Sequence, residues 1–354
     1  MLLEMAAVCI PFMLGSIAYF FPFNTCYAYG TIILQQIKLN YFGVRFWFHD
    51  VVNARYNKLD LPLMPEKTAI ITGGSRGIGA RIVKKLLQCD MNVILACRTV
   101  SAGEQLILQI RKSGVISGRP KVYKLDNSSL GSVREFAEQI KKDYSKIHIL
   151  INNAGVMLVP TYKETEDGFE EQWAVNYLSH FLLTSLLLPL LKAGGRSGES
   201  SRIINVTSCV QYMGVINFDD INSCYKGTYF TITAYTQSKL AQVIFTVALQ
   251  QFLKDRALNV ETFSVHPGVV NTELFNHTYL RGSWVMSLAK TPDEGAIPIL
   301  YAALNKDIEN KGGIYISNCK EYPNAAWALQ KNIQKQLFEL SLKQVKLHDF
   351  FQYL

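Results

Sequence analysis

The chain has 354 residues, is 49% hydrophobic and 18% charged, and carries a net charge of +8 from basic residues spread along its length. Because these residues form no cluster, they indicate solubility and attraction to anionic lipid, and they argue against nucleic-acid binding. The seven cysteines include no C-x-x-C pair and the six histidines show no ligand spacing, which argues against a disulfide framework or a metal site and fits a reducing compartment.

The N-terminal segment differs from the rest of the chain in composition. From Met5 to Ile37 there are 33 residues without a charged side chain, whereas one membrane-spanning helix needs about 20. A cleaved signal peptide is the alternative, but such peptides begin with positive charge and the early charged residue here is Glu4. We therefore expect residues 1–37 to be a membrane anchor. Its topology stays open between a kinked span, a hairpin in one leaflet and an interfacial segment, because three residues interrupt it: Pro11, Gly15 and Pro22.

Residues 38–60 combine basic and aromatic side chains in a way that suits the headgroup region of a membrane. The alternative is a helix packed on the globular domain. For a single span, the basic excess on its C-terminal side places the globular domain in the cytosol. We expect the membrane to be that of the endoplasmic reticulum or of a lipid droplet. The segment contains Lys38, Arg45, Arg55 and Lys58, the acid Asp50, and the aromatic residues Tyr41, Phe42, Phe46, Trp47 and Phe48.

The next predicted strand, 68–71, leads directly into a glycine-rich segment and then into an apolar helical pattern over 80–87. Glycines at such a junction can adopt positive φ and let the backbone approach a pyrophosphate, and the helix N-terminus presents unpaired N–H groups. The order predicts a dinucleotide cradle, with a purely structural turn as the alternative. The segment reads Thr72, Gly73, Gly74, Ser75, Arg76, Gly77, Ile78 and Gly79.

Further strand patterns alternate with helical patterns, which predicts an α/β fold with a single Rossmann-type, doubly wound parallel sheet covered by helices on both faces. No linker or repeat divides the sequence, so we expect one domain over 61–354. The helix after the last of these strands begins at a predicted capping box, Thr291 to Glu294. The strand patterns cover 93–96, 121–125, 147–151, 202–206 and 260–265.

The residues after the second strand indicate the cofactor. A carboxylate there would bind the ribose 2′-hydroxyl and repel a 2′-phosphate, but there is no acid between Met91 and Ser101. NADP(H) is therefore favoured, with NAD(H) left open. Arg98 and Arg76 can pair with the phosphate, unless both are solvated surface residues.

Two later strand ends carry polar residues that suit the rest of a dinucleotide. Asp126 follows the third strand and is placed to meet the adenine. The segment Asn152–Gly155 follows the fourth strand and closes the crevice, although Asn153 could instead be a structural hydrogen bonder.

Tyr235 and Lys239 lie four residues apart in a helical pattern, so their side chains face the same way. Bringing a phenol from a pKa of about 10 to near 7 needs roughly 4 kcal/mol, which one cation at ~4 Å supplies at an effective dielectric of ~20. The pair therefore predicts a tyrosine that can transfer a proton.

Six motifs in this order resemble the short-chain dehydrogenase/reductase family, over about Pro65 to Asn318. They are T-G-x-x-x-G-x-G, N-N-A-G, the asparagine of Val175-Asn176-Tyr177, the serine after the fifth strand, Y-x-x-x-K, and Pro267-Gly268. The resemblance implies an NAD(P)-dependent oxidoreductase acting on CH–OH groups, the rival being a non-catalytic nucleotide-binding scaffold.

The resemblance also implies roles for individual residues. Tyr235 is the general acid or base, Lys239 holds the nicotinamide ribose, Ser208 bonds the substrate oxygen, and Asn176 holds a relay water. Thr207 is the rival for the serine role, and His266 is more consistent with a strand-end position than with a catalytic base. The implied cofactor contacts are Thr72, Gly73, Ser75, Arg76, Gly77, Ile78, Gly79, Arg98, Asp126, Asn127, Asn153, Ala154, Gly155, Pro267, Gly268, Val270 and Thr272.

The substrate prediction depends on a segment at about 273–290, where this family places its substrate lid. Its one acid is Glu273, and its apolar side chains either pack on the domain or contact a lipophilic substrate directly. Beside a membrane anchor, an apolar lid suits a large lipophilic substrate. Three segments, 167–171, 266–272 and 290–296, resemble the branch of the family associated with polyprenol and dolichol, and next the retinol dehydrogenases. We expect polyprenol/polyprenal or dolichal/dolichol, with retinoids second and steroids third, and leave the oligomeric state open. The apolar lid residues are Leu274, Phe275, Tyr279, Leu280, Trp284, Val285, Met286 and Leu288.

The C-terminal tail is a second candidate for membrane contact. It carries Phe338, Leu342, Phe350 and Phe351, and it is apolar enough to contribute to an anchor.

Overall fold

The computed structural model describes residues 23–53, 57–225, 228–278 and 284–354. Its centre is an eight-stranded sheet in the order β10-β9-β8-β5-β4-β1-β2-β3. All neighbouring strands are parallel except β10, which pairs antiparallel with β9. The strands are β1 Thr68–Thr72, β2 Asn92–Cys97, β3 Arg119–Lys124, β4 Ile149–Asn152, β5 Ser201–Val206, β8 Val260–His266, β9 Tyr315–Ser317 and β10 Lys320–Tyr322.

The predicted doubly wound sheet is confirmed, because each of the six expected strands is present. Successive residues of β1 contribute to opposite cores, Ile70 to one and Ala69 and Ile71 to the other. A strand buried on both faces favours apolar side chains at every position, which is why β1, β2 and β4 appear as apolar runs, whereas β5 and β8 also bury polar side chains such as Asn205 and Thr262. The strand order reverses between β1 and β4, and ligands of such sheets bind outside the carboxyl ends of the strands at that point.

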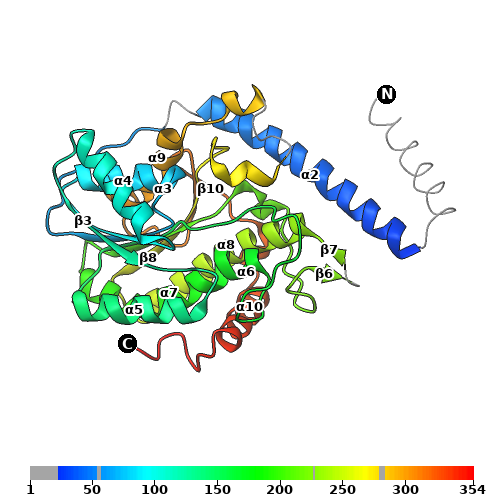
Figure 1. Ribbon diagram of the computed structural model, residues 1–354. Helices are drawn as coiled ribbons and strands as arrows, with labels where there is room; N and C mark the ends of the chain where they lie inside the picture. The colour runs from blue at the N-terminus through cyan, green and yellow to red at the C-terminus, as the bar shows by residue number, and fades with distance from the viewer. Residues whose placement is uncertain (1–22, 54–56, 226–227, 279–283) are drawn as a thin grey trace.

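Helices cover both faces of the sheet, as Figure 1 shows. One core lies under α3, α4 and α9, and the other under α5, α7, α8 and α10. The capping box predicted at Thr291 is present, with Thr291 Oγ1 accepting from the Glu294 backbone and the Glu294 carboxylate accepting from the Thr291 backbone. The bounds are α3 Gly77–Gln88, α4 Val100–Lys112, α5 Leu130–Asp143, α6 Glu171–Trp173, α7 Ser179–Gly194, α8 Thr231–Asp255, α9 Pro292–Leu304 and α10 Lys331–Gln344.

The helical run Glu171–Gly194 is long and apolar enough to cross a membrane, and it is the one such run among the described residues. Its most apolar window is 94% buried inside the protein. The helix is therefore accounted for as the central core helix of the domain, enclosed by its neighbours.

The C-terminal tail corrects one expectation. Phe338 and Phe350 are buried in the core with Phe181 and Phe245, and their rings contact one another. The apolar character of the tail is thus used inside the domain, and these two side chains are not offered to a membrane.

Short strands at the periphery were not expected from the sequence. The strands β9 and β10 extend the sheet, and a two-stranded hairpin is formed by β6, Cys224–Tyr225, and β7, Thr228–Tyr229. Strands of two or three residues are too short to produce a readable alternation of apolar and polar residues.

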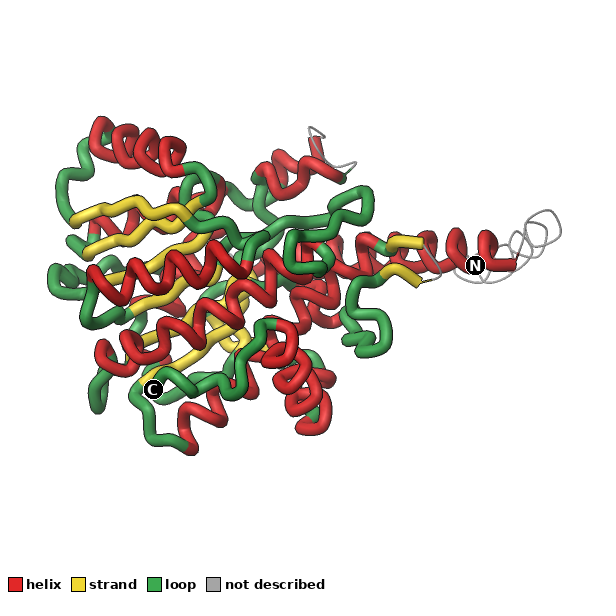
Figure 2. Tube along the Cα trace, turned by 60° about the horizontal axis from the view of Figure 1, so that its bottom comes forward, coloured by secondary structure: helices red, strands yellow, loops and turns green. Residues whose placement is uncertain are grey.

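The N-terminal helix α2, Phe23–Asn53, is continuous across the predicted boundary at residue 37. Its C-terminal half packs on the domain, where Phe46 and Asp50 are 2% and 3% exposed. Its N-terminal end projects beyond the body of the domain, as Figures 1 and 2 both show. Most of the predicted anchor, residues 1–22, lies outside the described residues.

The two faces of α2 differ in exposure. The face opposite Phe46 carries large apolar side chains that are exposed and repeat at helical spacing: Ile33, Leu34, Ile37, Tyr41, Val44, Phe48, Val51 and Val52. We call these eight residues the outer face of α2. The connector is thus a helix packed on the domain along one side only.

Candidate active site

The glycine loop between β1 and α3 has the geometry of a dinucleotide cradle. Gly73 has φ +64°, and a Cβ there would lie 2.8 Å from Ala154 Cα; a Cβ on Gly79 would lie 2.4 Å from the Gly73 carbonyl oxygen. Gly77, the first residue of α3, has φ +56°, which favours glycine. The N-cap residue Arg76 makes no side-chain bond to the helix end, so the N–H groups of α3 remain open to an anion. These features fit a pyrophosphate.

The segment after β4 is tied to this loop. Thr72 Oγ1 accepts from the backbone N–H groups of Asn153 and Ala154, both at 3.0 Å. Asn153 Nδ2 donates to the carbonyl oxygens of Thr72 at 2.9 Å and Gly73 at 3.1 Å. The Asn153 side chain therefore has the structural hydrogen-bonding role that the sequence also allowed. By these bonds it keeps the segment that leads to Gly155 beside the glycine loop.

The predicted adenine and phosphate residues occupy the expected strand ends. Arg98 is exposed directly after β2, and Asp126 follows β3, where its carboxylate accepts from the Ser128 backbone at 2.9 Å. Arg76, the other predicted phosphate partner, already has a counter-ion, because its Nη1 is paired with Glu273 at 2.7 Å. Both partners are mostly exposed, at 73% and 61%, so this pair is worth little in stability but links the glycine loop to the lid segment.

Tyr235 and Lys239 lie on α8 and are nearly buried, 4% and 6% exposed. Lys239 Nζ donates to the Val206 carbonyl at 3.0 Å and to Gln242 Oε1 at 3.1 Å, and it lies 5.9 Å from the centre of the Tyr235 ring. Burial lowers the pKa of Lys239 to about 7. Burial, with the neighbouring Cys209, raises the pKa of Tyr235 and outweighs a hydrogen bond from Ser208. The phenol is thus held protonated, whereas the sequence argument considered the ammonium alone.

Ser208 and Thr207, rivals for one role, have different surroundings. Thr207 Oγ1 donates to the Lys239 carbonyl at 2.8 Å and is 3% exposed. Ser208 is less buried, its Oγ accepts from the Val210 N–H at the start of the 3-10 helix Cys209–Tyr212, and it lies near enough to Tyr235 to act on the pKa of that phenol. Because Thr207 is already engaged with the backbone, the geometry favours Ser208 as the hydroxyl beside the reacting oxygen.

Asn176 lies in a single π-helical turn, Ala174–Leu178, a feature that often marks functional sites. Its Oδ1 accepts from the Val156 backbone at 2.8 Å, and its Nδ2 donates to the Val156 carbonyl at 3.0 Å and to Ser238 Oγ at 2.9 Å. A Cβ on Gly155 would lie 3.2 Å from Asn176 Oδ1 and 3.7 Å from Lys239 Nζ, so both side chains lie next to Gly155.

His180 is a member of the site that sequence reasoning missed. Its Nδ1 lies 3.0 Å from the Asn176 carbonyl, and its Nε2 lies 2.9 Å from Thr72 Oγ1. Because a carbonyl only accepts, Nδ1 carries the proton, and Nε2 accepts from the Thr72 hydroxyl. His180 thereby joins the glycine loop to the π-helical turn. The feature of the sequence that could have identified His180 is its position four residues after Asn176, on the same helical face.

Apolar side chains surround the Tyr235 ring. The buried members of this cluster are Phe46 from α2, Met157, Cys209 and Val210, and side chains of the lid segment, Leu274 and Phe275, pack against it. Met286 is buried, and Leu288 is 51% exposed. Tyr279 and Leu280 lie outside the described residues, as do the side chains of Trp284 and Val285.

His266 is the last residue of β8 and is 2% exposed. Burial lowers its pKa to about 4, so it is uncharged at neutral pH, and its ring packs edge-on against Phe46. This position agrees with a strand-end residue. Among the described residues, no group of three or more histidine, cysteine or acidic side chains could hold a metal ion.

Comparisons with known proteins agree with this geometry. The short chain dehydrogenase family matches residues 67–280. Human polyprenol dehydrogenase is 39% identical over 297 residues, covering 81% of this chain and 88% of the relative, and mouse retinol dehydrogenase 13 is 39% identical over 293 residues, covering 80% and 85%. A solved structure of an uncharacterized protein from Mycobacterium paratuberculosis superposes with a TM-score of 0.65 at 32% identity, covering 81% of this chain and 96% of that one. The chain belongs to the short chain dehydrogenase family, whose members are NAD(P)-dependent oxidoreductases.

Proposed function

We propose that this protein is an NAD(P)-dependent oxidoreductase that interconverts a lipophilic alcohol and its aldehyde or ketone. The observation that carries the proposal is the convergence of Ser208, Tyr235 and Lys239 at the carboxyl ends of the strands, beside the glycine loop and within an apolar cluster. The proposed substrates are polyisoprenoids, polyprenol/polyprenal or dolichal/dolichol. The similarity to polyprenol dehydrogenases from three vertebrates, at 36–39% identity, supports this choice.

Bound NADPH or NADH supplies the hydride, or NADP or NAD accepts it. In reduction, the Tyr235 hydroxyl donates its proton to the carbonyl oxygen of the substrate, and the Ser208 hydroxyl donates a hydrogen bond to the same oxygen. The raised pKa of Tyr235 keeps the donor protonated at neutral pH. Lys239, with a pKa of about 7, can return a proton to the tyrosine, and Asn176, which lies beside the same glycine as Lys239 Nζ, is the residue proposed to hold a relay water.

The cofactor preference we propose is NADP(H). Arg98 follows β2 directly, and no carboxylate is present at that strand end to bind a ribose 2′-hydroxyl. The remaining predicted cofactor residues lie on the glycine loop, on the segment after β4 and on the turn after β8.

We assign the location as a membrane surface, with residues 1–37 as anchor, 38–60 as a connector at the headgroups and 61–354 as the catalytic domain. The outer face of α2 supports this arrangement, because it continues an uncharged N-terminal window of 33 residues as an exposed apolar surface. The domain is assigned to the cytosolic side of the endoplasmic reticulum or of lipid droplets.

The function is tested by assaying the full-length protein in detergent with polyprenal, dolichal, retinal and a ketosteroid, each with NADPH and with NADH. We expect the polyisoprenoid aldehydes with NADPH to give the highest kcat/KM. Retinal is the second candidate, because retinol dehydrogenases are 37–39% identical to the chain. Efficient retinal turnover without activity on polyisoprenoids would replace the first choice by the second, and NADPH binding without any turnover would favour a scaffold.

The mechanism is tested with Tyr235→Phe, which keeps the ring and removes the proton donor. Loss of a general acid costs about 10²–10⁴ in rate, so we expect kcat to fall by at least ~10²-fold while NADPH still binds. Wild-type turnover in this variant contradicts the assigned mechanism.

A further inference from the structure

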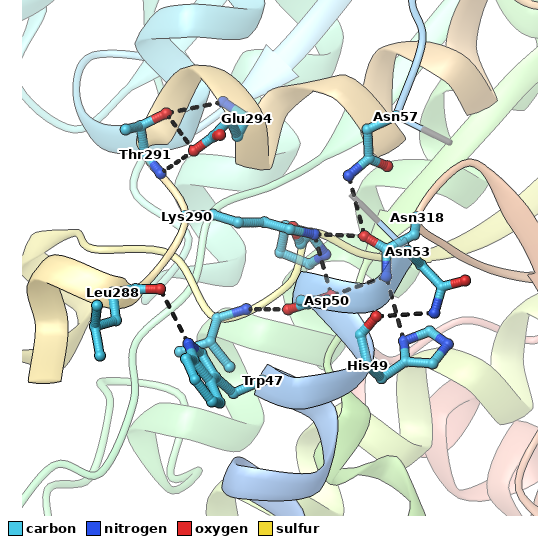
Figure 3. Close-up of polar contacts among 12 residues, drawn as sticks. Trp47, His49, Asp50, Asn53, Asn57, Leu288, Lys290, Thr291, Glu294 and Asn318 are labelled. Carbon is cyan, nitrogen blue, oxygen red and sulfur yellow. Dashed lines mark hydrogen bonds and ion pairs between the residues drawn. The ribbon is translucent and has the colours of Figure 1, made fainter. Parts of the chain in front are cut away.

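The turn after β8 is held by a side chain that comes from the N-terminal helix. Asp50 Oδ2 accepts from the Val269 backbone N–H at 2.9 Å, and its Oδ1 accepts from Lys290 Nζ at 3.1 Å and from Asn318 Nδ2 at 2.9 Å. Figure 3 shows Asp50 at the centre of these contacts. One carboxylate thus joins four segments of the chain: α2, the turn, the lid segment and the connection between β9 and β10.

The contacts of Asp50 are shielded from solvent. The Asp50 and Lys290 side chains are only 4% and 10% exposed, and Lys290 Nζ also donates to Asn318 Oδ1 at 2.6 Å. Gly268 has φ +97°, and a Cβ there would lie 2.7 Å from Asp50 Oδ2 and 2.6 Å from Lys290 Nζ. The Asp50 carboxylate and the Lys290 ammonium therefore pack directly against the turn.

Charge favours this arrangement as well as geometry. Burial alone would raise the pKa of Asp50, but nearby His266, Lys290, the Val269 N–H and Asn318 together lower it. At neutral pH His266 is uncharged, because its own pKa is about 4, so Lys290 is the cation that keeps Asp50 ionised. A buried ion pair is weak evidence for stability by itself, since desolvation offsets the attraction, and a role in fixing local structure is the stronger reason for its presence.

The turn faces the cofactor cradle. The backbone N–H of Lys290 also bonds to the turn, donating to the Val269 carbonyl at 2.9 Å. A Cβ on Gly295 would lie 2.6 Å from Val270 and 3.4 Å from Ile78, and a Cβ on Gly77 would lie 3.6 Å from Thr272. The residues after the turn are therefore packed beside the start of α3, on the glycine-loop side of the sheet edge.

We propose that Asp50 is a positioning residue of the active site: it fixes the turn Pro267–Val269, and through it Val270 and Thr272, against the glycine loop, so that α2 is required for cofactor binding. The inference rests on the proposed function, in which residues of this turn and of the segment after it contact the cofactor. The helix α2, which follows the proposed membrane anchor, then contributes to the cofactor site through Asp50. The bond from Trp47 Nε1 to the Leu288 carbonyl, at 3.0 Å, joins the same helix to the lid segment.

The test uses Asp50→Asn in the full-length protein in detergent. Asparagine has nearly the same volume but one acceptor oxygen, so its amide must face either the Val269 N–H or the donors of Lys290 and Asn318. Losing a hydrogen bond to a charged group corresponds to roughly 10–100-fold in an equilibrium constant, and we expect the NADPH dissociation constant, followed by fluorescence, to rise at least ~10-fold. We expect KM for NADPH to rise with it, and the KM of the carbonyl substrate at saturating NADPH to stay within about twofold.

The matched control is Glu309→Gln, which breaks another buried ion pair far from the turn. Glu309 pairs with Arg202 at 3.0 Å at the amino end of β5, with side chains 15% and 7% exposed. This control should lower Tm without changing the NADPH dissociation constant. A second variant, Lys290→Met, leaves Asp50 bonded to Val269 and should weaken NADPH binding less than Asp50→Asn does.

The positioning role is wrong if folded Asp50→Asn binds NADPH within about twofold of the wild type, or if Glu309→Gln weakens binding equally. Should Asp50→Asn fail to fold, Lys290→Met decides alone, and unchanged NADPH binding in that variant overturns the role. Because NADPH binding is measured without substrate, failure of the proposed polyisoprenoid activity does not affect this test. Failure of the wild type to bind NADPH would instead refute the proposed function.

Discussion

Arg98 is the residue on which cofactor choice is expected to depend, since it is exposed at the end of β2 where a 2′-phosphate would lie. Replacing it by alanine removes a charge-assisted partner of that phosphate. We expect Arg98→Ala to lower the ratio of kcat/KM for NADPH over NADH by roughly 10–100-fold, corresponding to the loss of a hydrogen bond to a charged group. Arg76→Ala is the comparison, because its guanidinium is paired with Glu273, and it should change the ratio less. An unchanged ratio in Arg98→Ala means that another residue reads the phosphate.

The π-helical turn is bonded to a histidine that makes it sensitive to acid. His180 is buried without charge, and burial lowers its pKa from 6.5 to about 4. Since the unfolded chain binds the proton more tightly, the contribution of His180 to the free energy of unfolding is fully present above pH 6.5. It is lost as the pH falls from about 6.5 towards 4. One such histidine accounts for roughly 2 kcal/mol between pH 7.5 and pH 5.

This pH dependence is checked by chemical unfolding of the wild type and of His180→Gln at both pH values. We expect the variant to be less stable at pH 7.5, because it loses the bridge between Thr72 and Asn176, but to lose less further stability at pH 5. Tyr123→Phe is a control on the same face of the sheet that leaves the histidine unchanged. Equal acid sensitivity in the wild type and in His180→Gln would show that other groups, such as His148 with its pKa of about 4, dominate.

The elements of the sheet illustrate what can be predicted from sequence. The buried strands β1, β2 and β4 appear as apolar runs, and the glycine loop is recognisable because its glycines are required by positive φ and close backbone contacts. The inner face of α2 could not be predicted in this way. The environment of Asp50 depends on Lys290 and Asn318, which lie 240 and 268 residues away in the chain, and local periodicity contains no information about such partners.

The same limit applies to the chemistry of the site. Spacing correctly brought Tyr235 and Lys239 onto one helix, but the raised pKa of the phenol follows from its burial and, secondly, from the neighbouring Cys209. The resemblance to the family favours Ser208 over Thr207, and the physical reason appears in the structure, where the Lys239 carbonyl accepts from Thr207.

For the whole molecule, attachment to membranes is expected to depend on two adjoining surfaces. Removing residues 1–37 takes away the predicted anchor and keeps Phe46 and Asp50 in the domain, so the truncated protein should stay folded and bind membranes much more weakly. The remaining outer face of α2 predicts residual binding, which Val44→Glu with Phe48→Glu in the truncated protein should abolish. Flotation with phosphatidylcholine and phosphatidylserine vesicles measures both effects.

The matched control places the same charge on an exposed apolar residue elsewhere, Ile116→Glu, which is 86% exposed before replacement. Membrane binding of the truncated protein that is insensitive to the α2 substitutions would locate the contact on another surface.

The enclosure of the central helix has a consequence for biosynthesis. Part of the cover over α7 comes from the last residues of the chain: Phe338 and Phe350 contact Phe181, and the Phe350 carbonyl accepts from Ser185 Oγ at 2.6 Å. A ribosome therefore exposes a segment as apolar as a membrane span well before it makes the residues that shield it. The predicted N-terminal anchor would be made earlier, which makes α7 the second apolar segment of the nascent chain. The burial of α7 is finished only when the C-terminus is complete, so a premature stop before Phe338 would leave a surface suited to chaperones or to misinsertion.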